Sequence, residues 1–240
     1  MKPLAYHELN DMFAEPGCAI CNLLKRGVEH SISTLLYEFT LDLDVNKAFR
    51  EGRGLCNEHG NQLLDHKGSS LSIAILYQAI VNDLLKVVEQ PSGDPASQPM
   101  LGRLLKPDAD NSLAARLGPS RSCLVCDILI EAEERYVHAL SEHIGDETLR
   151  RKYEQSEGLC LSHFRQVLRR MRNPANGQLL VTIQKTIWAK LKAELDEFIA
   201  KNDYQRTDPM GIEGDSWSRA ARRIAGEKGI FGLGHRDSDR

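Results

Sequence analysis

Residues 54–59 read GLCNEH, and residues 158–163 read GLCLSH. Upstream of each stands a pair of cysteines with two residues between them, CAIC at 18–21 and CLVC at 123–126. The interval from pair to single cysteine is nearly constant, with 34 residues between Cys21 and Cys56 and 33 between Cys126 and Cys160. The chain therefore contains an internal repeat, and each copy carries one C-x2-C and one G-L-C-x2-H motif.

All six cysteines of the chain fall in these motifs, so none is left over. Thiolate and imidazole are the ligands that zinc prefers in structural sites, and four of them complete a tetrahedron. A C-x2-C pair grips one ion from a tight turn, and a C-x2-H motif places two further ligands on one helical turn. The sequence therefore predicts two metal sites with eight ligands: Cys18, Cys21, Cys56, His59, Cys123, Cys126, Cys160 and His163.

The distribution of these ligands between two ions has two solutions. We expect each ion within one copy, so that the sites are Cys18, Cys21, Cys56 and His59, and Cys123, Cys126, Cys160 and His163. Each site then closes the ends of one helical hairpin. In the exchanged solution, the C-x2-C of each copy joins the C-x2-H of the other. Loop-closure entropy favours the within-copy solution only weakly, because it depends on the logarithm of loop length.

Apolar residues recur at three- and four-residue steps after each motif, which is the pattern of amphipathic helices. In the first copy this pattern predicts helices at about 18–39, 45–51, 56–59 and 70–90, the last capped by Ser70. In the second copy it predicts helices at about 126–142, 146–156, 162–172 and 179–202. No strand pattern is present. The predicted fold is all-α, with two pseudo-repeated helical units, each closed by a Cys3His metal site.

Composition breaks mark the predicted boundaries between segments. We expect a first repeat at 1–90 and a second at 122–203, joined by an irregular linker at 91–121 that holds five of the nine prolines. The NPANG stretch at 173–177 is expected to separate the last two helices. A polar tail at 204–240 is expected to carry one short helix near 215–225, capped by Ser216 or Asp215 and docked by Trp217 and Ile224.

Composition and charge exclude several classes of protein. With 41% apolar and 27% charged residues the chain has the composition of a soluble globular protein, and a net charge of −3 argues against a nucleic-acid binder with a basic surface. The most apolar stretch, 71–85, is interrupted by Gln78, Asn82 and Asp83, so we expect no membrane span. No export signal precedes the motifs, and we expect a cytoplasmic protein without structural disulfides.

Other polar residues give weaker signals. Glu29 and Glu134 occupy corresponding places in the two copies, where they either face the metal ends or are solvated helix charges. Surface or hydrogen-bonded positions are expected for the histidines that do not repeat, and solvated positions for two arginine clusters. These residues are His30, His66, His138 and His143, and Arg165, Arg169, Arg172, Arg219, Arg222 and Arg223.

The predicted function follows from the closed ligand sets. Four protein ligands leave no open position for water or substrate, and the phosphate-loop, zinc-protease, serine-hydrolase and haem-attachment motifs are all missing from the sequence. We therefore expect a non-catalytic protein with two zinc ions that serves as a binding or adaptor module for a protein partner. One alternative is a redox or sensor protein with one or two iron-sulfur clusters on the same ligands. Another is dithiol redox chemistry at the C-x2-C pairs.

The two motif pairs, together with the stretch from Asp203-Tyr204 to Gly214-Asp215-Ser216-Trp217, resemble a family of uncharacterised bacterial proteins. That family is a domain of unknown function with paired C-x2-C and G-[LF]-C-x2-H motifs, and the resemblance covers nearly the whole chain. It implies the same eight ligands and no particular activity. Many members have proline after the first cysteine of the pair, where this chain has Ala19 and Leu124.

Overall fold

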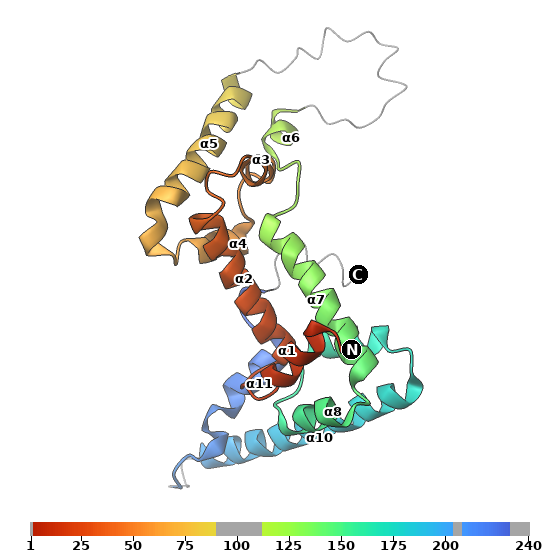
Figure 1. Ribbon diagram of the computed structural model, residues 1–240. Helices are drawn as coiled ribbons and strands as arrows, with labels where there is room; N and C mark the ends of the chain where they lie inside the picture. The colour runs from red at the N-terminus through yellow and green to blue at the C-terminus, as the bar shows by residue number, and fades with distance from the viewer. Residues whose placement is uncertain (1, 90–111, 204–207, 231–240) are drawn as a thin grey trace, which may run out of the picture. The chain divides into compact units, whose positions relative to one another are not determined.

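The computed structural model describes residues 2–89, 112–203 and 208–230, and every regular element in these ranges is helical (Figure 1). The elements of the first copy are α1 (Leu4–Met12), α2 (Ala19–Tyr37), α3 (Leu43–Glu51), α4 (Asn57–Leu63), η1 (Lys67–Ser69) and α5 (Ser70–Glu89). The remaining elements are α6 (Leu113–Leu117), α7 (Leu124–His143), α8 (Glu147–Gln155), α9 (Leu161–Arg170), α10 (Pro174–Lys201), η3 (Ile212–Asp215) and α11 (Ser216–Ala225). The all-α prediction is confirmed.

The described residues belong to two compact units. One unit contains those of Met1–Glu29 and Leu129–Ile230, and the other contains those of His30–Ile128. Helices α2 and α7 each contribute residues to both units, and each unit takes helices from both sequence copies. The segment boundaries expected at 90, 121 and 203 stay predictions, and most of the predicted linker lies outside the described residues.

The first unit is held together around α8. Helix α1 packs on α8, and α10 contacts both α8 and α11 (Figure 1). Asp146 caps α8 by accepting hydrogen bonds from the backbone N–H groups of its first turn, and the same carboxylate accepts one from the Tyr6 hydroxyl at 2.6 Å. This hydrogen bond, with that of Lys2, lowers the pKa of Asp146. The cap of one helix thus anchors another.

The second unit is arranged around α5, which contacts α3 and α6. Phe49 of α3 is fully buried and meets the Tyr77 ring edge to face, with ring centroids 5.4 Å apart. Arg50 makes a two-pronged ion pair with Asp83, at 2.7 and 2.8 Å. Asp83, one of the polar residues that interrupt the apolar stretch 71–85, therefore binds helix α3.

Helix α5 has a further property. Together with the preceding turn, Lys67–Glu89 is long and apolar enough to cross a membrane by length and composition, and 11% of its most apolar window is buried. Leu71, Val81, Leu85 and Val88 are among its exposed apolar side chains. The expectation that the chain has no membrane span stays a prediction.

Several local features differ from the sequence-based expectations, among them the short helix α6 within the segment expected to be an irregular linker. Helix α1 was not predicted, although Tyr6, Leu9 and Met12 recur on one face and are buried. Helix α10 begins at Pro174, inside the expected break, because proline suits the first helical turn and the Asn173 side chain accepts a hydrogen bond from Ala175. The Ser70 cap is also absent, since Ser70 continues the helical turn of η1 into α5.

Candidate metal centres

In the first unit, three sulfurs and one imidazole nitrogen converge. Cys18, Cys21 and Cys160 place their Sγ atoms 3.4, 3.4 and 3.2 Å from Nδ1 of His163, and the sulfurs of Cys21 and Cys160 are 3.7 Å apart. All four residues are buried. We name this group cluster A.

In the second unit, the other four residues form a matching group, cluster B. Cys56, Cys123 and Cys126 place their sulfurs 3.4, 3.6 and 3.4 Å from Nδ1 of His59, and the sulfurs of Cys56 and Cys126 are 3.7 Å apart. In each cluster all four ligand atoms lie within 4.8 Å of one another. The structure thus brings together all eight residues singled out in the sequence.

The expected pairing within each copy is wrong. Cys18 and Cys21 meet Cys160 and His163, while Cys123 and Cys126 meet Cys56 and His59, so each cluster joins the C-x2-C of one copy to the C-x2-H of the other. The clusters therefore do not close hairpins within a copy. In this exchanged solution the starts of α2 and α9 meet in one unit, and those of α7 and α4 meet in the other.

Every ligand pair lies on the first turn of a helix. Cys56 and Cys160 are the N-cap residues of α4 and α9, and His59 and His163 follow three residues later. Cys18 and Cys123 stand in the same way before α2 and α7, where their carbonyl oxygens accept hydrogen bonds from Asn22 and Asp127. Because a helix start carries partial positive charge, both clusters lie where thiolates are stabilised.

A buried glutamine supports the turn into Cys160. The amide oxygen of Gln184, on α10, accepts hydrogen bonds from the Tyr153 hydroxyl and from the Leu159 backbone N–H, and its amide nitrogen donates to the Leu159 carbonyl. Gly158 has φ +77° there, and a Cβ at this position would lie 2.9 Å from the Gln184 amide oxygen. Glycine is therefore required both for its backbone angle and for space.

The turn before cluster B is supported by a different residue. Gly54 has φ +89°, and a Cβ there would lie 3.1 Å from the Tyr77 ring. Burial raises the pKa of Tyr77 above its usual value, although a hydrogen bond from the Leu55 backbone partly opposes the rise. The glycine of the G-L-C motif thus has the same backbone role in both copies, while its neighbours differ.

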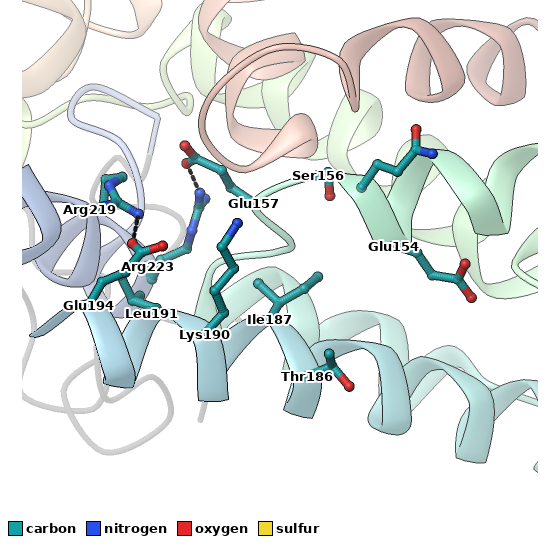
Figure 2. Close-up of a pocket in the computed structure, with 11 residues that line it drawn as sticks. Glu154, Ser156, Glu157, Thr186, Ile187, Lys190, Leu191, Glu194, Arg219 and Arg223 are labelled. Carbon is teal, nitrogen blue, oxygen red and sulfur yellow. Dashed lines mark hydrogen bonds and ion pairs between the residues drawn. The ribbon is translucent and has the colours of Figure 1, made fainter. Parts of the chain in front are cut away.

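Glu157 links the two ligand-bearing loops of cluster A. Its carboxylate accepts a hydrogen bond of 3.0 Å from the backbone N–H of Gly17, next to Cys18, and forms an ion pair with Arg223 of α11. Figure 2 shows this pair beside a second one, between Arg219 and Glu194, at 2.6 Å. Both pairs line a pocket bounded by α10, α11 and the segment that follows α8. Helix α11 therefore braces the loops of cluster A.

The prediction that Trp217 and Ile224 dock α11 onto the rest of the protein is wrong. Trp217 and Ile224 are 59% and 62% exposed, whereas Arg223 and Ser216 are buried. The ion pair between Arg223 and Glu157, and not an apolar contact, attaches α11 to the rest of the unit. The helix itself runs where it was predicted, but neither Asp215 nor Ser216 makes a capping hydrogen bond with its side chain.

The carboxylate at cluster A is Glu133. Its Oε1 lies 2.9 Å from Nε2 of His163, and both side chains are buried. Glu29 and Glu134, which the repeat singled out, are exposed, and Glu134 forms a 3.5 Å ion pair with Arg170. Sequence reasoning missed Glu133 because the corresponding residue of the first copy is Val28, so the repeat carries no signal for it.

The other four histidines singled out in the sequence do not join either cluster. His30 and His138 are exposed, while His66 and His143 are half-buried. Burial lowers the pKa of His143. Within the described residues, only clusters A and B gather histidine, cysteine or acidic side chains in a metal-binding arrangement.

The ligand groups of each cluster change one another's ionisation. Burial alone would lower the pKa of His163, but the Cys160 and Cys18 thiolates raise it well above its usual value. In cluster B, the hydrogen bond from Cys126 lowers the pKa of Cys123 to about 3, and the same contact raises the pKa of Cys126. Three thiols this close can all ionise only with a cation among them.

The sequence also places the chain in a protein family. A family described as being of unknown function, DUF6062, matches residues 2–229, which is nearly the whole chain. The chain belongs to DUF6062. No curated protein and no solved structure matches it. Membership of DUF6062 thus agrees with the resemblance seen in the motifs and assigns no activity, so the chemistry of the two clusters has to be argued from their geometry.

We expect Gly158→Ala to destabilise the protein by roughly 1–2 kcal/mol or more, because the substitution strains a positive φ and crowds Gln184. The measurement is urea unfolding followed by circular dichroism. Gly27→Ala is the matched control: Gly27 lies within α2, a Cβ there would meet nothing within 4 Å, and the change should be neutral or stabilising. Equal stability of the two variants would contradict the assigned role of Gly158.

Proposed function

We propose that this protein binds two zinc ions, one in cluster A and one in cluster B, and that the ions hold the fold of a non-catalytic binding or adaptor protein. The observation that carries the zinc assignment is the spacing of the ligand atoms. The adaptor role is supported by apolar side chains exposed on α11. Each part has its own test.

The ligand spacing fits a single zinc ion. Zinc bonds of about 2.3 Å to sulfur and about 2.0 Å to nitrogen give tetrahedral edges of roughly 3.8 Å between sulfurs and roughly 3.5 Å between sulfur and nitrogen. In each cluster one pair of sulfurs is 3.7 Å apart, the distances from sulfur to Nδ1 are 3.2–3.6 Å, and all four ligand atoms lie within 4.8 Å of one another. An iron-sulfur cluster places its ligands on different irons and needs wider spacing. The distances therefore favour one small ion in each cluster.

The charge of such a site is also balanced. Zinc with three thiolates and one neutral imidazole carries a net charge of −1. Each cluster lies at two helix starts, and a helix start contributes a partial charge of roughly +0.5. Two of them offset about one negative charge, so the zinc complex itself needs no further cation, and the Glu133 carboxylate adds a negative charge beside His163 at cluster A. The donor set and its surroundings therefore suit the same ion.

Four protein ligands leave no coordination position for water or substrate. Zinc in this arrangement supplies binding energy for folding, and apparent values for such sites are about 10–16 kcal/mol. Cluster A is also fully buried, so substrate has no route to the ion. These features support a structural role and disfavour catalysis at the metal.

The apolar side chains of α11 support a protein partner. Trp217 and Ile224 are seven residues apart, share one face of the helix, and are more than half exposed. Ile212, on the preceding turn, is 77% exposed. Ser216 and Arg223, about 100° around the helix from these side chains, are buried, and Arg223 is paired with Glu157, so the apolar face is held in position for binding. Aromatic residues in such positions often dominate protein interfaces.

We expect protein purified without oxygen to be colourless and to contain two zinc ions per chain by elemental analysis. Cys21→Ser and Cys126→Ser should each remove one zinc, and chelation of both ions should unfold the chain, as circular dichroism would report. Because Cys21 and Cys160 share cluster A, their double variant should retain one zinc, whereas Cys21→Ser with Cys56→Ser should retain none.

Two other outcomes would overturn the zinc assignment. Iron in the elemental analysis, with absorption in the visible range, would favour the iron-sulfur alternative. Six freely reactive thiols and no metal would favour dithiol redox chemistry.

We expect Trp217→Ser with Ile224→Ser to weaken retention of a protein partner by about 30-fold, the loss typical when hot-spot residues are removed. Affinity capture with the full chain as bait measures it. Leu4→Ser with Val181→Ser, at exposed positions on α1 and α10, is the control and should leave retention unchanged. Equal retention by the two double variants, or turnover of a substrate by purified protein, would refute the adaptor role.

A further inference from the structure

The two clusters hold their histidines differently. At cluster A, His163 turns Nδ1 toward the sulfurs and Nε2 toward Glu133, whose Oε1 is 2.9 Å away. Gln166 donates a 2.8 Å hydrogen bond to the same carboxylate oxygen. Glu133 is therefore fixed in place, and it holds the imidazole in the tautomer and orientation that Nδ1 ligation requires.

At cluster B, His59 also turns Nδ1 toward the sulfurs, but its Nε2 is buried and has no hydrogen-bond partner among the described residues. The two copies of the repeat differ at the matching position. Cys123 follows Cys18 by 105 residues, and Glu133 follows Val28 by the same 105, so the first copy offers a hydrocarbon where the second offers a carboxylate. Gln62, the counterpart of Gln166, instead bonds Glu58 at 3.4 Å.

Exposure separates the clusters further. All four ligand residues of cluster A are buried, whereas Cys56 of cluster B is half-buried. Cys56 is the most solvent-exposed of the six cysteines. A competing ligand can therefore approach the ion of cluster B beside Cys56, while the ion of cluster A is covered on every side.

Both differences act in the same direction. A carboxylate on the far nitrogen of a metal-bound histidine strengthens the ligand, and its loss typically weakens metal binding by about 10–100-fold. A buried N–H without an acceptor adds a further cost to the bound state at His59. Access at Cys56 lets a chelator attack the ion stepwise. Cluster B therefore holds its ion less tightly and less permanently.

Building on the proposed zinc sites, we propose that cluster B is an exchangeable zinc site and cluster A a permanent one. Competing small ligands with thiolate, carboxylate or pyridyl donors take the zinc of cluster B first. Zinc passes from the four protein ligands to the competitor, and the released thiolates take up protons from water. The protein can thereby give up one ion while the first unit keeps its own.

The test begins with zinc-loaded full-length protein whose content of two ions is established by elemental analysis. Excess 4-(2-pyridylazo)resorcinol reports zinc release by its colour, and short pulses of iodoacetamide followed by peptide mass spectrometry identify which cysteines become free. We expect two phases whose rates differ by at least about 10-fold. Cys56, Cys123 and Cys126 should be alkylated in the fast phase, and Cys18, Cys21 and Cys160 only in the slow one.

A single rate of release, or labelling of Cys18, Cys21 and Cys160 first, would overturn this inference while leaving both zinc sites intact. Protein that contains no zinc at the outset would instead refute the proposed function. The two failures are therefore distinguishable before chelator is added.

A pair of variants on α7 tests the part of Glu133. Glu133→Gln should speed the slow phase by about 10–100-fold and leave the fast phase unchanged. Glu134→Gln, at the next residue, is the matched control, because the Glu134 side chain is 64% exposed and should affect neither phase. If Glu133→Gln leaves the slow phase unchanged in folded protein, the assigned role is wrong. If that variant fails to fold, the order of labelling in the unaltered protein decides.

Discussion

Four cysteine and histidine side chains in each unit converge from two helix starts that are far apart along the chain, and a metal ion bound by them would hold those starts together. Cys21 and Cys160 are 139 residues apart, and Cys56 and Cys126 are 70 apart, yet the sulfurs of each pair are separated by 3.7 Å. The helix starts, the supporting turn residues and the burial of the ligands all depend on this convergence. Each ion would therefore join the two copies of the repeat to each other.

The exchanged pairing is inexpensive in free energy. Cys21 is 35 residues from the expected within-copy partner Cys56 but 139 from Cys160, which is about two doublings of loop length. Each doubling costs roughly 0.6 kcal/mol, so the longer loop costs roughly 1.2 kcal/mol. Zinc binding at such a site contributes about 10–16 kcal/mol. Loop length is therefore a small term in the choice between the two pairings.

This balance explains what the sequence could and could not predict. The eight residues that form the two clusters and most helices were predictable, because motif spacing and apolar periodicity are local properties of the chain. The pairing of these residues was not, because loop-closure entropy separates the two solutions by only about 1 kcal/mol and both copies carry the same motifs. Helix α1 had a visible signal in Tyr6, Leu9 and Met12, and the start of α10 had one in Asn173 and Pro174.

Residues that support the ligands were the hardest to predict. Glu133 and Gln184 act at cluster A, but the first copy has Val28 and Ile80 at the corresponding positions, so reading the chain as a repeat directs attention away from them. The role of Arg223 was missed for another reason. Arginines in a helix rich in arginine are usually solvated, whereas Arg223 is buried in an ion pair with Glu157. Comparison of the two copies identifies the residues that they have in common, whereas clusters A and B differ at positions where the copies have different residues.

The most direct test of the account is an anomalous difference map from crystals of the unaltered protein, measured at the zinc absorption edge. The account predicts two peaks, one bonded to Cys18, Cys21, Cys160 and His163 and the other to Cys56, His59, Cys123 and Cys126. A zinc ion bonded to Cys18 and Cys21 together with Cys56 and His59 would contradict it, because each copy would then close on itself.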